Sequence, residues 1–166
     1  HSTTSEEAAT HSGGNSGKGG DFLFRWGNPQ NYARGNDADQ ILYSQHSINW
    51  IDTGYPGEGN LIIFNNSHYG NNSTVIEISP PIDSNGNYII SDTLPYGPIT
   101  WEWMFYDSNI LSSQIVQSGA FRLENGNTYI TTFSNATMLE ISYEGDVLFE
   151  YSVPEPNVKI NRAKKY

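Results

Sequence analysis

The chain has 166 residues, a length that fits one ordinary domain or a piece of a larger one. It contains no cysteine, which excludes disulfides, thiolate zinc sites, iron–sulfur clusters and thiol nucleophiles. Eight basic side chains face 18 acidic ones, and the formal net charge of −10 opposes binding to nucleic acid or anionic membranes. No stretch approaches the roughly 18 apolar residues of a membrane span. We therefore expect no nucleic-acid partner and no membrane span.

The composition predicts an all-β protein with many tight turns. Aromatic residues make up 13% of the chain although apolar residues reach only 36%, and there are 18 Asn and 16 Gly. Residues that favour strands and turns are therefore common, whereas residues that favour helices are under-used. The aromatic content separates this chain from disordered sequences.

The first 20 residues form a polar segment that differs from the rest of the chain. Residues 12–20 are a Gly/Ser-rich run, which we expect to be a flexible loop. Before this run, residues 5–9 (SEEAA) could open one helical turn, with carboxylates at its N-terminus. We therefore treat residues 1–20 as a loop segment and residues 21–166 as the folded part.

From residue 21 onward, short β-type runs alternate with turn signals. Asn85-Gly86, Asn125-Gly126 and Glu144-Gly145-Asp146 are typical of tight turns. Paired prolines at residues 80–81 and the Pro-Glu-Pro at residues 154–156 end strands, because proline cannot donate to a ladder. The pattern predicts strands near residues 21–26, 46–51, 60–65, 74–79, 100–106, 116–123, 128–133, 137–143, 146–151 and 158–165.

An internal repeat organises these strands. Residues 59–66 (GNLIIFNN) are echoed by residues 126–133 (GNTYITTF), and residues 73–78 (STVIEI) by residues 136–141 (ATMLEI). The repeat predicts two units of four strands, with an outer strand before them and an inner strand after them. These units cover about residues 45–106 and 116–151.

Four-stranded units that recur along a chain are typical of β-propeller blades. A propeller closes only with about four to eight blades, and we find two complete ones. We therefore expect the C-terminal part of a larger propeller, which requires a missing upstream half or a partner chain to avoid long exposed edges. A self-contained β-sandwich with the same number of strands is the alternative.

His46 is the main candidate for chemistry. The repeat places it in the first strand of a blade, which is innermost in a propeller and begins at the central channel. The matching positions of the next first strands hold Gln117, Ser118 and Arg162. An imidazole, polar donors and a guanidinium in one cavity could handle an anion. A hydrogen-bonded structural histidine, with Arg162 tying the chain end, is the other interpretation.

The three other histidines fall in polar segments. His1 is terminal, His11 precedes the glycine run, and His68 follows Asn-Asn-Ser in a stretch that reads as a turn. We expect all three to be loop residues.

Five motifs follow one another along the chain. They are residues 20–29 (GDFLFRWGNP), 45–51 (QHSINWI), 59–66 (GNLIIFNN), 118–128 (SGAFRLENGNT) and 162–166 (RAKKY). Together they resemble the C-terminal part of the bacterial arylsulfate sulfotransferase family, the type that is independent of the nucleotide donor. The likeness covers essentially the whole chain. Members of that family are six-bladed β-propellers, so the resemblance implies this architecture.

The resemblance also implies sulfuryl transfer from an aryl sulfate donor to a phenolic acceptor through a sulfohistidine. His46 falls on the family's nucleophilic histidine. We expect Gln45 and Asn49 to orient its ring. Trp50 is expected to wall the aryl pocket, with a buried core position on the blade as the alternative. Sulfuryl transfer should pass through a loose transition state, in which positioning and cationic stabilisation matter most. A neutral imidazole can serve as nucleophile, so no metal and no other cofactor is required.

The family's remaining catalytic groups, two further histidines and an arginine, lie in motifs upstream of those found here. We therefore expect the chain by itself to be inactive, and we interpret Arg25 as structural. The competing class is a non-catalytic secreted propeller whose Asn-rich loops and aromatic side chains bind glycans or proteins. The acidic composition and the lack of cysteine suit an extracytoplasmic setting, either periplasmic or secreted, or a high-salt setting.

Overall fold

The structure is a computed structural model that describes residues 4–112, 114 and 116–165. His1 lies outside the described residues, and so does Tyr166, the last residue of the motif RAKKY. The chain forms two compact units. They comprise His1–Gln40 with Pro81–Gly97, and Ile41–Pro80 with Pro98–Tyr166.

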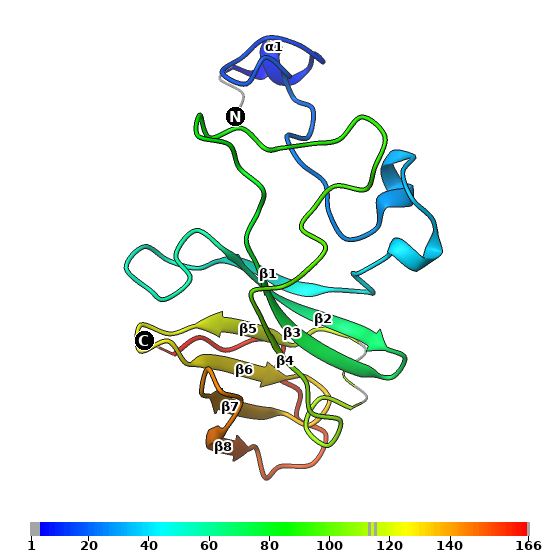
Figure 1. Cartoon of the computed structure of the whole chain (residues 1–166). Coiled ribbons are helices and arrows are strands. Elements are labelled where there is room, and N and C mark those ends of the chain that lie inside the picture. Colours follow the sequence, from blue (N-terminus) through cyan, green and yellow to red (C-terminus); the bar gives the residue numbers. More distant parts are fainter. Residues whose placement is uncertain (1–3, 113, 115, 166) are drawn as a thin grey trace. The chain divides into compact units, whose positions relative to one another are not determined.

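The second unit contains two four-stranded antiparallel sheets, in which the strand order follows the chain (Figure 1). The orders are β1-β2-β3-β4 and β5-β6-β7-β8. The strands are β1 (His46–Trp50), β2 (Leu61–Tyr69), β3 (Asn72–Ile78), β4 (Trp103–Phe105), β5 (Gly119–Arg122), β6 (Thr128–Thr132), β7 (Thr137–Ile141) and β8 (Val147–Ser152). The mostly β fold and the two four-stranded units predicted by the repeat are confirmed.

The predicted turn chemistry explains how neighbouring strands are joined. Between β5 and β6, the Leu123 amide donates to the Asn127 carbonyl (2.8 Å), and Gly126 has a φ of 87°. Between β7 and β8, Gly145 has a φ of 99°. Such values suit glycine because it lacks a Cβ, so these sequence signals identified both hairpins correctly.

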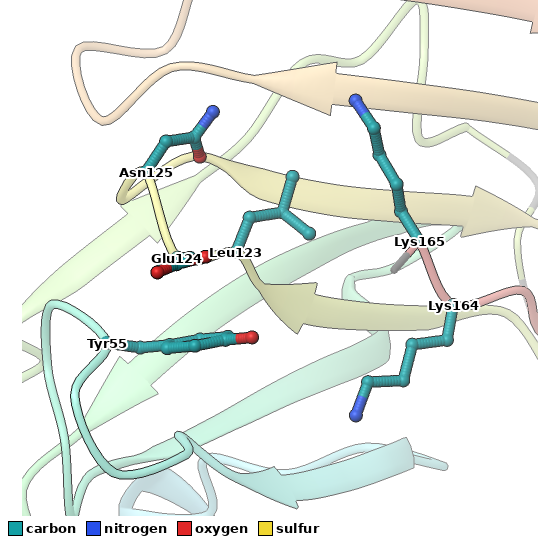
Figure 2. Close-up of a pocket in the computed structure, with 6 residues that line it drawn as sticks. All are labelled: Tyr55, Leu123, Glu124, Asn125, Lys164 and Lys165. Atoms are coloured by element: carbon teal, nitrogen blue, oxygen red, sulfur yellow. The ribbon is translucent and has the colours of Figure 1, made fainter.

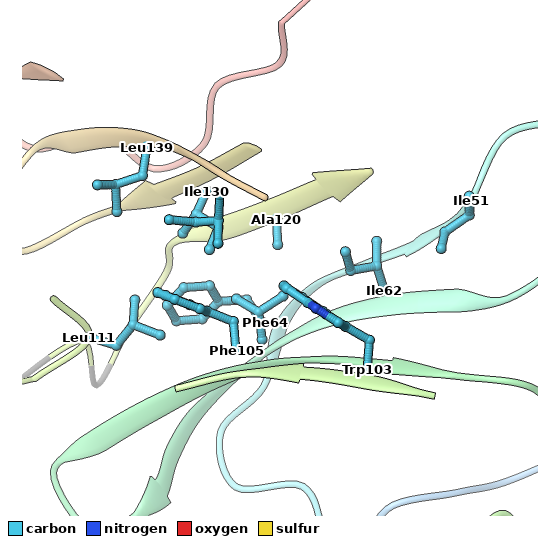
Figure 3. Close-up of a cluster of buried hydrophobic side chains, with 11 residues drawn as sticks. Ile51, Ile62, Phe64, Trp103, Phe105, Leu111, Ala120, Ile130 and Leu139 are labelled. Carbon is cyan, nitrogen blue, oxygen red and sulfur yellow. The ribbon is translucent and has the colours of Figure 1, made fainter. Parts of the chain in front are cut away.

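The hydrophobic core lies between the two sheets. Phe64 on β2 and Ile130 on β6 are completely buried, and Figure 3 shows the side chains of the two sheets pointing toward each other. A fully buried side chain of this size contributes about 1.5–3 kcal/mol, so this cluster is a major stabiliser of the second unit. The cluster consists of Ile51, Ile62, Phe64, Val75, Trp103, Phe105, Leu111, Ala120, Ile130, Leu139 and Ile141.

The first unit has little regular structure. It contains α1 (Ser5–Ala8) and two short 3₁₀ helices, η1 (Pro29–Tyr32) and η2 (Asp37–Asp39). The side chains of Thr4 and Glu7 form a capping box at the start of α1, which confirms the predicted helical turn. None of the helices in the described part of the chain has the length and apolarity that a membrane crossing requires.

The strand predicted at residues 21–26 is absent from the structure. Its central aromatic residue, Phe24, stacks on Tyr88 with ring centres 4.8 Å apart instead of pairing in a sheet, whereas Phe22 is exposed. Arg25 donates from Nη1 to the Asn31 carbonyl (3.1 Å), a local structural role. Sequence periodicity cannot distinguish a paired strand from a loop in which an aromatic ring packs on other rings.

The strand predicted at residues 158–165 is also absent. This C-terminal segment instead lies beside β5 and β6 of the second sheet (Figure 1) and is held by individual hydrogen bonds. Lys159 Nζ donates to the Ser134 carbonyl (2.7 Å), and the Ala163 amide donates to Thr131 Oγ1 (3.1 Å). Residues 158–165 therefore lie against the second sheet without forming a regular ladder.

Candidate functional site

A pocket of about 250 Å³ opens where β1, the residues before β5 and the C-terminal segment meet. The repeat register predicted that His46, Gln117, Ser118 and Arg162 would converge, and the structure brings these four residues together. The pocket is lined by His46, Ser47, Gln117, Ser118, Asn161 and Arg162. It combines an imidazole, hydroxyl and amide groups and one guanidinium, a set suited to an anion.

The backbone around this pocket is strained at several positions. Ser44, Ser47, Gln117 and Ser118 have φ values of 53°, 53°, 54° and 74°. Residues other than glycine rarely adopt positive φ, and each such residue costs on the order of 1 kcal/mol. The surrounding structure must hold these residues in place, and strain of this kind concentrates at functional sites.

Gly119 allows three layers to approach closely beside the pocket. A Cβ at this position would lie 3.0 Å from Ser47 Oγ and 3.0 Å from Arg162 Cγ. A larger residue would therefore crowd the side chains of Ser47 and Arg162, which would have to shift to make room. The missing side chain of Gly119 thus leaves room for both Ser47 and Arg162 beside this backbone.

His46 is oriented by a residue that the sequence analysis missed. Its Nδ1 lies 2.9 Å from Oδ1 of Asn66, which is completely buried in β2. The Asn66 Nδ2 donates to the carbonyls of Gln114 and Gln117, the latter at 3.3 Å. Asparagine is unfavourable in a β-strand, so the paired asparagines that directly follow the apolar run of β2 were the signal that could have revealed Asn66.

Gln45 and Asn49 do not orient the ring as expected. Asn49 Nδ2 donates to the carbonyl and Oγ of Ser47 and to the Ala120 carbonyl, each at 3.0 Å. It therefore ties β1 to β5. Gln45 is exposed and does not line the pocket.

Trp50 belongs to a second pocket, of about 320 Å³. This pocket lies beside the His46 pocket. It is lined by the same three segments, β1, β5 and the C-terminal segment, but by residues further along each of them. Trp50, 53% exposed, and Phe121 provide aromatic surface. Lys164 supplies a cation, 3.6 Å from the Asp52 carboxylate. The expected aromatic wall is thus adjacent to the His46 pocket and not part of it.

A third pocket, of about 400 Å³, continues along the same segments (Figure 2). Figure 2 shows that the side chains of Lys164 and Lys165 extend in opposite directions. Lys165 Nζ lies 2.5 Å from Oε2 of Glu140. This hydrogen bond, together with one from Asn127, lowers the pKa of Glu140 to about 2. Lys165 is therefore engaged in a structural ion pair. The pocket is lined by Tyr55, Leu123, Glu124, Asn125, Lys164 and Lys165.

The two sheets carry equivalent polar joints, each of which connects a sheet to the next layer. In the first joint, Glu77 accepts from Asn60 Nδ2 (2.6 Å) and forms an ion pair with Arg122 of β5. In the second, Glu140 accepts from Asn127 Nδ2 (2.7 Å) and from Lys165. The glutamates and asparagines occupy matching positions of the sequence repeat. Lys165 is therefore the counterpart of Arg122.

His68 is not the solvated loop residue that we expected. It lies within β2, half-buried, with its Nδ1 2.9 Å from Thr74 Oγ1. Its ring stacks on Tyr69 with ring centres 4.5 Å apart. Burial lowers its pKa, so the ring stays neutral at pH 7. His11, by contrast, lies in an exposed loop as predicted, with Nδ1 2.7 Å from Asp21 Oδ1.

Within residues 4–112, 114 and 116–165, no three His, Asp or Glu side chains gather in a way that could hold a metal ion. Comparisons of the chain with protein-family profiles, with curated proteins and with solved structures found no match.

Proposed function

We propose that the two sheets are consecutive blades of a β-propeller. Each sheet is a simple meander, as blades are, and β5 packs against β1 and β2 of the preceding sheet. The C-terminal segment lies on β5 and β6 in the same manner, with Lys165 at the position that Arg122 holds in the previous joint. A β-sandwich accounts for two packed sheets but gives no reason for this third layer.

The exposure of β8, the last strand of the second sheet, is evidence for a larger assembly. All six residues of β8 are exposed, and Phe149 and Tyr151 each keep 47% of their surface accessible. The next blade would bury them, as the second sheet buries Phe64 and Phe105 of the first. We infer that this blade comes from the upstream propeller half or from a partner chain, and that the chain alone is inactive.

Within this class, we propose an arylsulfate sulfotransferase-like enzyme that transfers a sulfuryl group through a sulfohistidine on His46. The observation that carries the proposal is the pocket that joins His46 to Arg162. A guanidinium matches the oxygens of a sulfuryl group, and the imidazole supplies the nucleophile. The family resemblance supplies the choice of sulfate esters over other anions. The acidic composition and the lack of cysteine are the grounds for proposing an extracytoplasmic location.

The neighbouring pocket fits the aryl part of such a substrate. Trp50 and Phe121 offer aromatic faces next to the charged pocket, so one end of an aryl sulfate could stack while the other meets Arg162. The phenolic acceptor, which resembles the leaving group, would use the same surface after the first product departs.

The test is covalent labelling in the full-length protein. Incubation with an ³⁵S-labelled aryl sulfate, without acceptor, should place the label on His46, and addition of a phenol should remove it. His46→Asn should abolish both labelling and turnover. His68→Asn is the matched control, because His68 is also half-buried but lies outside the pocket, and it should retain activity. Full turnover by His46→Asn would refute the proposal.

A non-catalytic binding module remains the second candidate, and one feature of the first unit favours it. A pocket of about 510 Å³ there combines aromatic rings with amides and Arg25, a composition that suits a glycan. Its residues are Phe22, Phe24, Arg25, Trp26, Asn28, Asn31 and Tyr32. Binding of glycans without any labelling of His46 would favour this candidate.

A further inference from the structure

We propose that Asn66 is a positioning residue that keeps the proton of neutral His46 on Nδ1 and thereby makes Nε2 the nucleophilic atom. The inference rests on the proposed sulfuryl transfer for its functional meaning. Its structural part, the position of one proton, follows from hydrogen bonding alone.

The orientation of the Asn66 amide is fixed by its partners. Its Nδ2 points to the carbonyls of Gln114 and Gln117, which can only accept hydrogen bonds. The reversed amide would place Oδ1 against these two oxygens, an arrangement with no proton between them. Oδ1 therefore faces His46, and because this oxygen can only accept, His46 Nδ1 must donate.

The carbonyl of Gln114, one of the two groups that hold Asn66, belongs to a wider hydrogen-bond network. Gln114 is completely buried, and its carbonyl also accepts from Ser73 Oγ (2.8 Å). The Gln114 side chain donates to the Ser112 carbonyl (3.1 Å) and accepts from the Ser134 amide (2.9 Å). Breaking any of these bonds would leave a buried polar group unpaired, which costs about 1–3 kcal/mol. The amide is thus unable to turn without disrupting its surroundings.

This arrangement defines the bonds that change. The Nε2 lone pair forms a bond to sulfur while the bond from sulfur to the aryl oxygen breaks, and the aryl oxygen leaves with the electron pair as a phenolate. The sulfated ring retains its Nδ1 proton and gains one positive charge, which the Asn66 oxygen stabilises. A deprotonated acceptor phenol then attacks sulfur, the bond from sulfur to Nε2 breaks, and the neutral ring is restored.

An uncharged hydrogen-bond acceptor at position 66 suits an anionic substrate. A carboxylate in place of the Asn66 amide would add a negative charge beside a sulfate ester, in a chain whose net charge is already −10. A carboxylate also has no proton to donate to the carbonyls of Gln114 and Gln117. An asparagine can hold the ring and its own platform together without repelling the substrate.

The test is the position of the ring proton, measured by ¹⁵N NMR at pH 9, where histidine side chains are generally neutral. His46→Gln identifies the signals of His46 by their loss. In the unmodified chain, Nδ1 should show the shift and proton coupling of a protonated nitrogen and Nε2 those of a bare one. A protonated Nε2 would overturn the inference without any variant.

Two variants sharpen the result. Asn66→Leu removes the acceptor with little change in volume, so the His46 ring should lose its preference for Nδ1–H and labelling by an aryl sulfate should slow on the order of 10- to 100-fold. Asn65→Leu is the matched control. Asn65 is equally buried in the same strand but bonds to the Tyr43 amide and the Ile41 carbonyl. An unchanged ring signal in folded Asn66→Leu would overturn the inference.

The outcome also separates this inference from the proposed function. If the proton moves in Asn66→Leu but His46 of the full-length protein never takes a sulfuryl group, Asn66 positions His46 and the proposed chemistry is wrong. If His46 is labelled while its proton resides on Nε2, the proposed function stands and the role of Asn66 is refuted.

Discussion

The two polar joints of this molecule use the same design in different surroundings. The Arg122 and Glu77 side chains are 1% and 5% exposed, and the guanidinium lies 4.9 Å from the centre of the Trp103 ring. In the second joint, Lys165 is 54% exposed and Glu140 is 9% exposed. The difference comes from the covering layer. A complete sheet closes the first joint, whereas only the C-terminal segment lies over the second.

The comparison shows how the same carboxylate–cation interaction changes when no complete sheet covers it. In the covered joint, an arginine meets the carboxylate, and Arg122 Nη1 also donates to Thr128 Oγ1 (2.8 Å). In the open joint, a lysine with a compact charge is sufficient because water solvates the rest of its surface. The same carboxylate and amide pair thus meets a buried cation in one sheet and a half-exposed cation in the other.

The largest expected difference follows from removing the cation of each joint. Arg122→Leu leaves Glu77 buried without its partner and should lower the free energy of unfolding by about 3–5 kcal/mol. Lys165→Leu should cost less, about 1–2 kcal/mol, because the Lys165 side chain is half-exposed and solvent screens its charge. Urea unfolding of both variants measures the two losses. Equal losses would show that the covering sheet does not distinguish the joints.

Acid should weaken the open joint over a defined pH range. The pKa of Glu140 is lowered from its usual 4.5 to about 2, so its contribution is complete above pH 4.5 and is lost as the pH falls toward 2. The shift corresponds to at most about 3 kcal/mol, and solvent screening of Lys165 reduces this to about 1–2 kcal/mol.

Glu140→Gln provides the control for this effect, because glutamine cannot ionise. The difference in unfolding free energy between the unmodified chain and Glu140→Gln should be largest at neutral pH and should shrink below pH 4.5. A difference that stays constant between pH 7 and pH 2.5 would contradict the ion pair.

The smallest effect should come from the open face of the second sheet. Phe149→Ser should change the stability of the isolated chain by less than about 0.5 kcal/mol, because Phe149 is exposed. In the full-length protein, where the proposed next blade covers this face, the same substitution should cost about 2 kcal/mol or more. Thermal unfolding of both forms measures this contrast. Equal, small effects in both would argue against a blade at this face.

The repeat and the turn signals were sufficient to predict the two sheets. Strand period and turn residues act over a few neighbours, so their signals remain readable in the chain, as at Asn125-Gly126. The same local signals failed for residues 21–26, where Phe24 packs on Tyr88 instead of pairing. His68 was misjudged for a related reason, since neighbouring polar residues concealed its stacking on Tyr69.

The candidate site was only partly predictable. The repeat register correctly brought His46, Gln117, Ser118 and Arg162 to one pocket, because equivalent positions of stacked units meet at the same edge. It did not reveal Asn66, and it assigned Asn49 to the wrong task. Hydrogen-bond partners depend on side-chain directions and backbone shifts of about an ångström, which sequence spacing does not encode.

The sequence by itself determined that this protein is built from two repeated four-stranded units, because alternation and turn formation are local properties of the chain. Only the tertiary structure decided which groups meet. Ser47, Gly119 and Arg162 come from segments far apart in the chain, and they lie side by side because packing closes the layers where glycine leaves space. The orientation of His46 by Asn66 is of the same kind, since a buried amide must satisfy its hydrogen bonds with the partners that the folded chain provides.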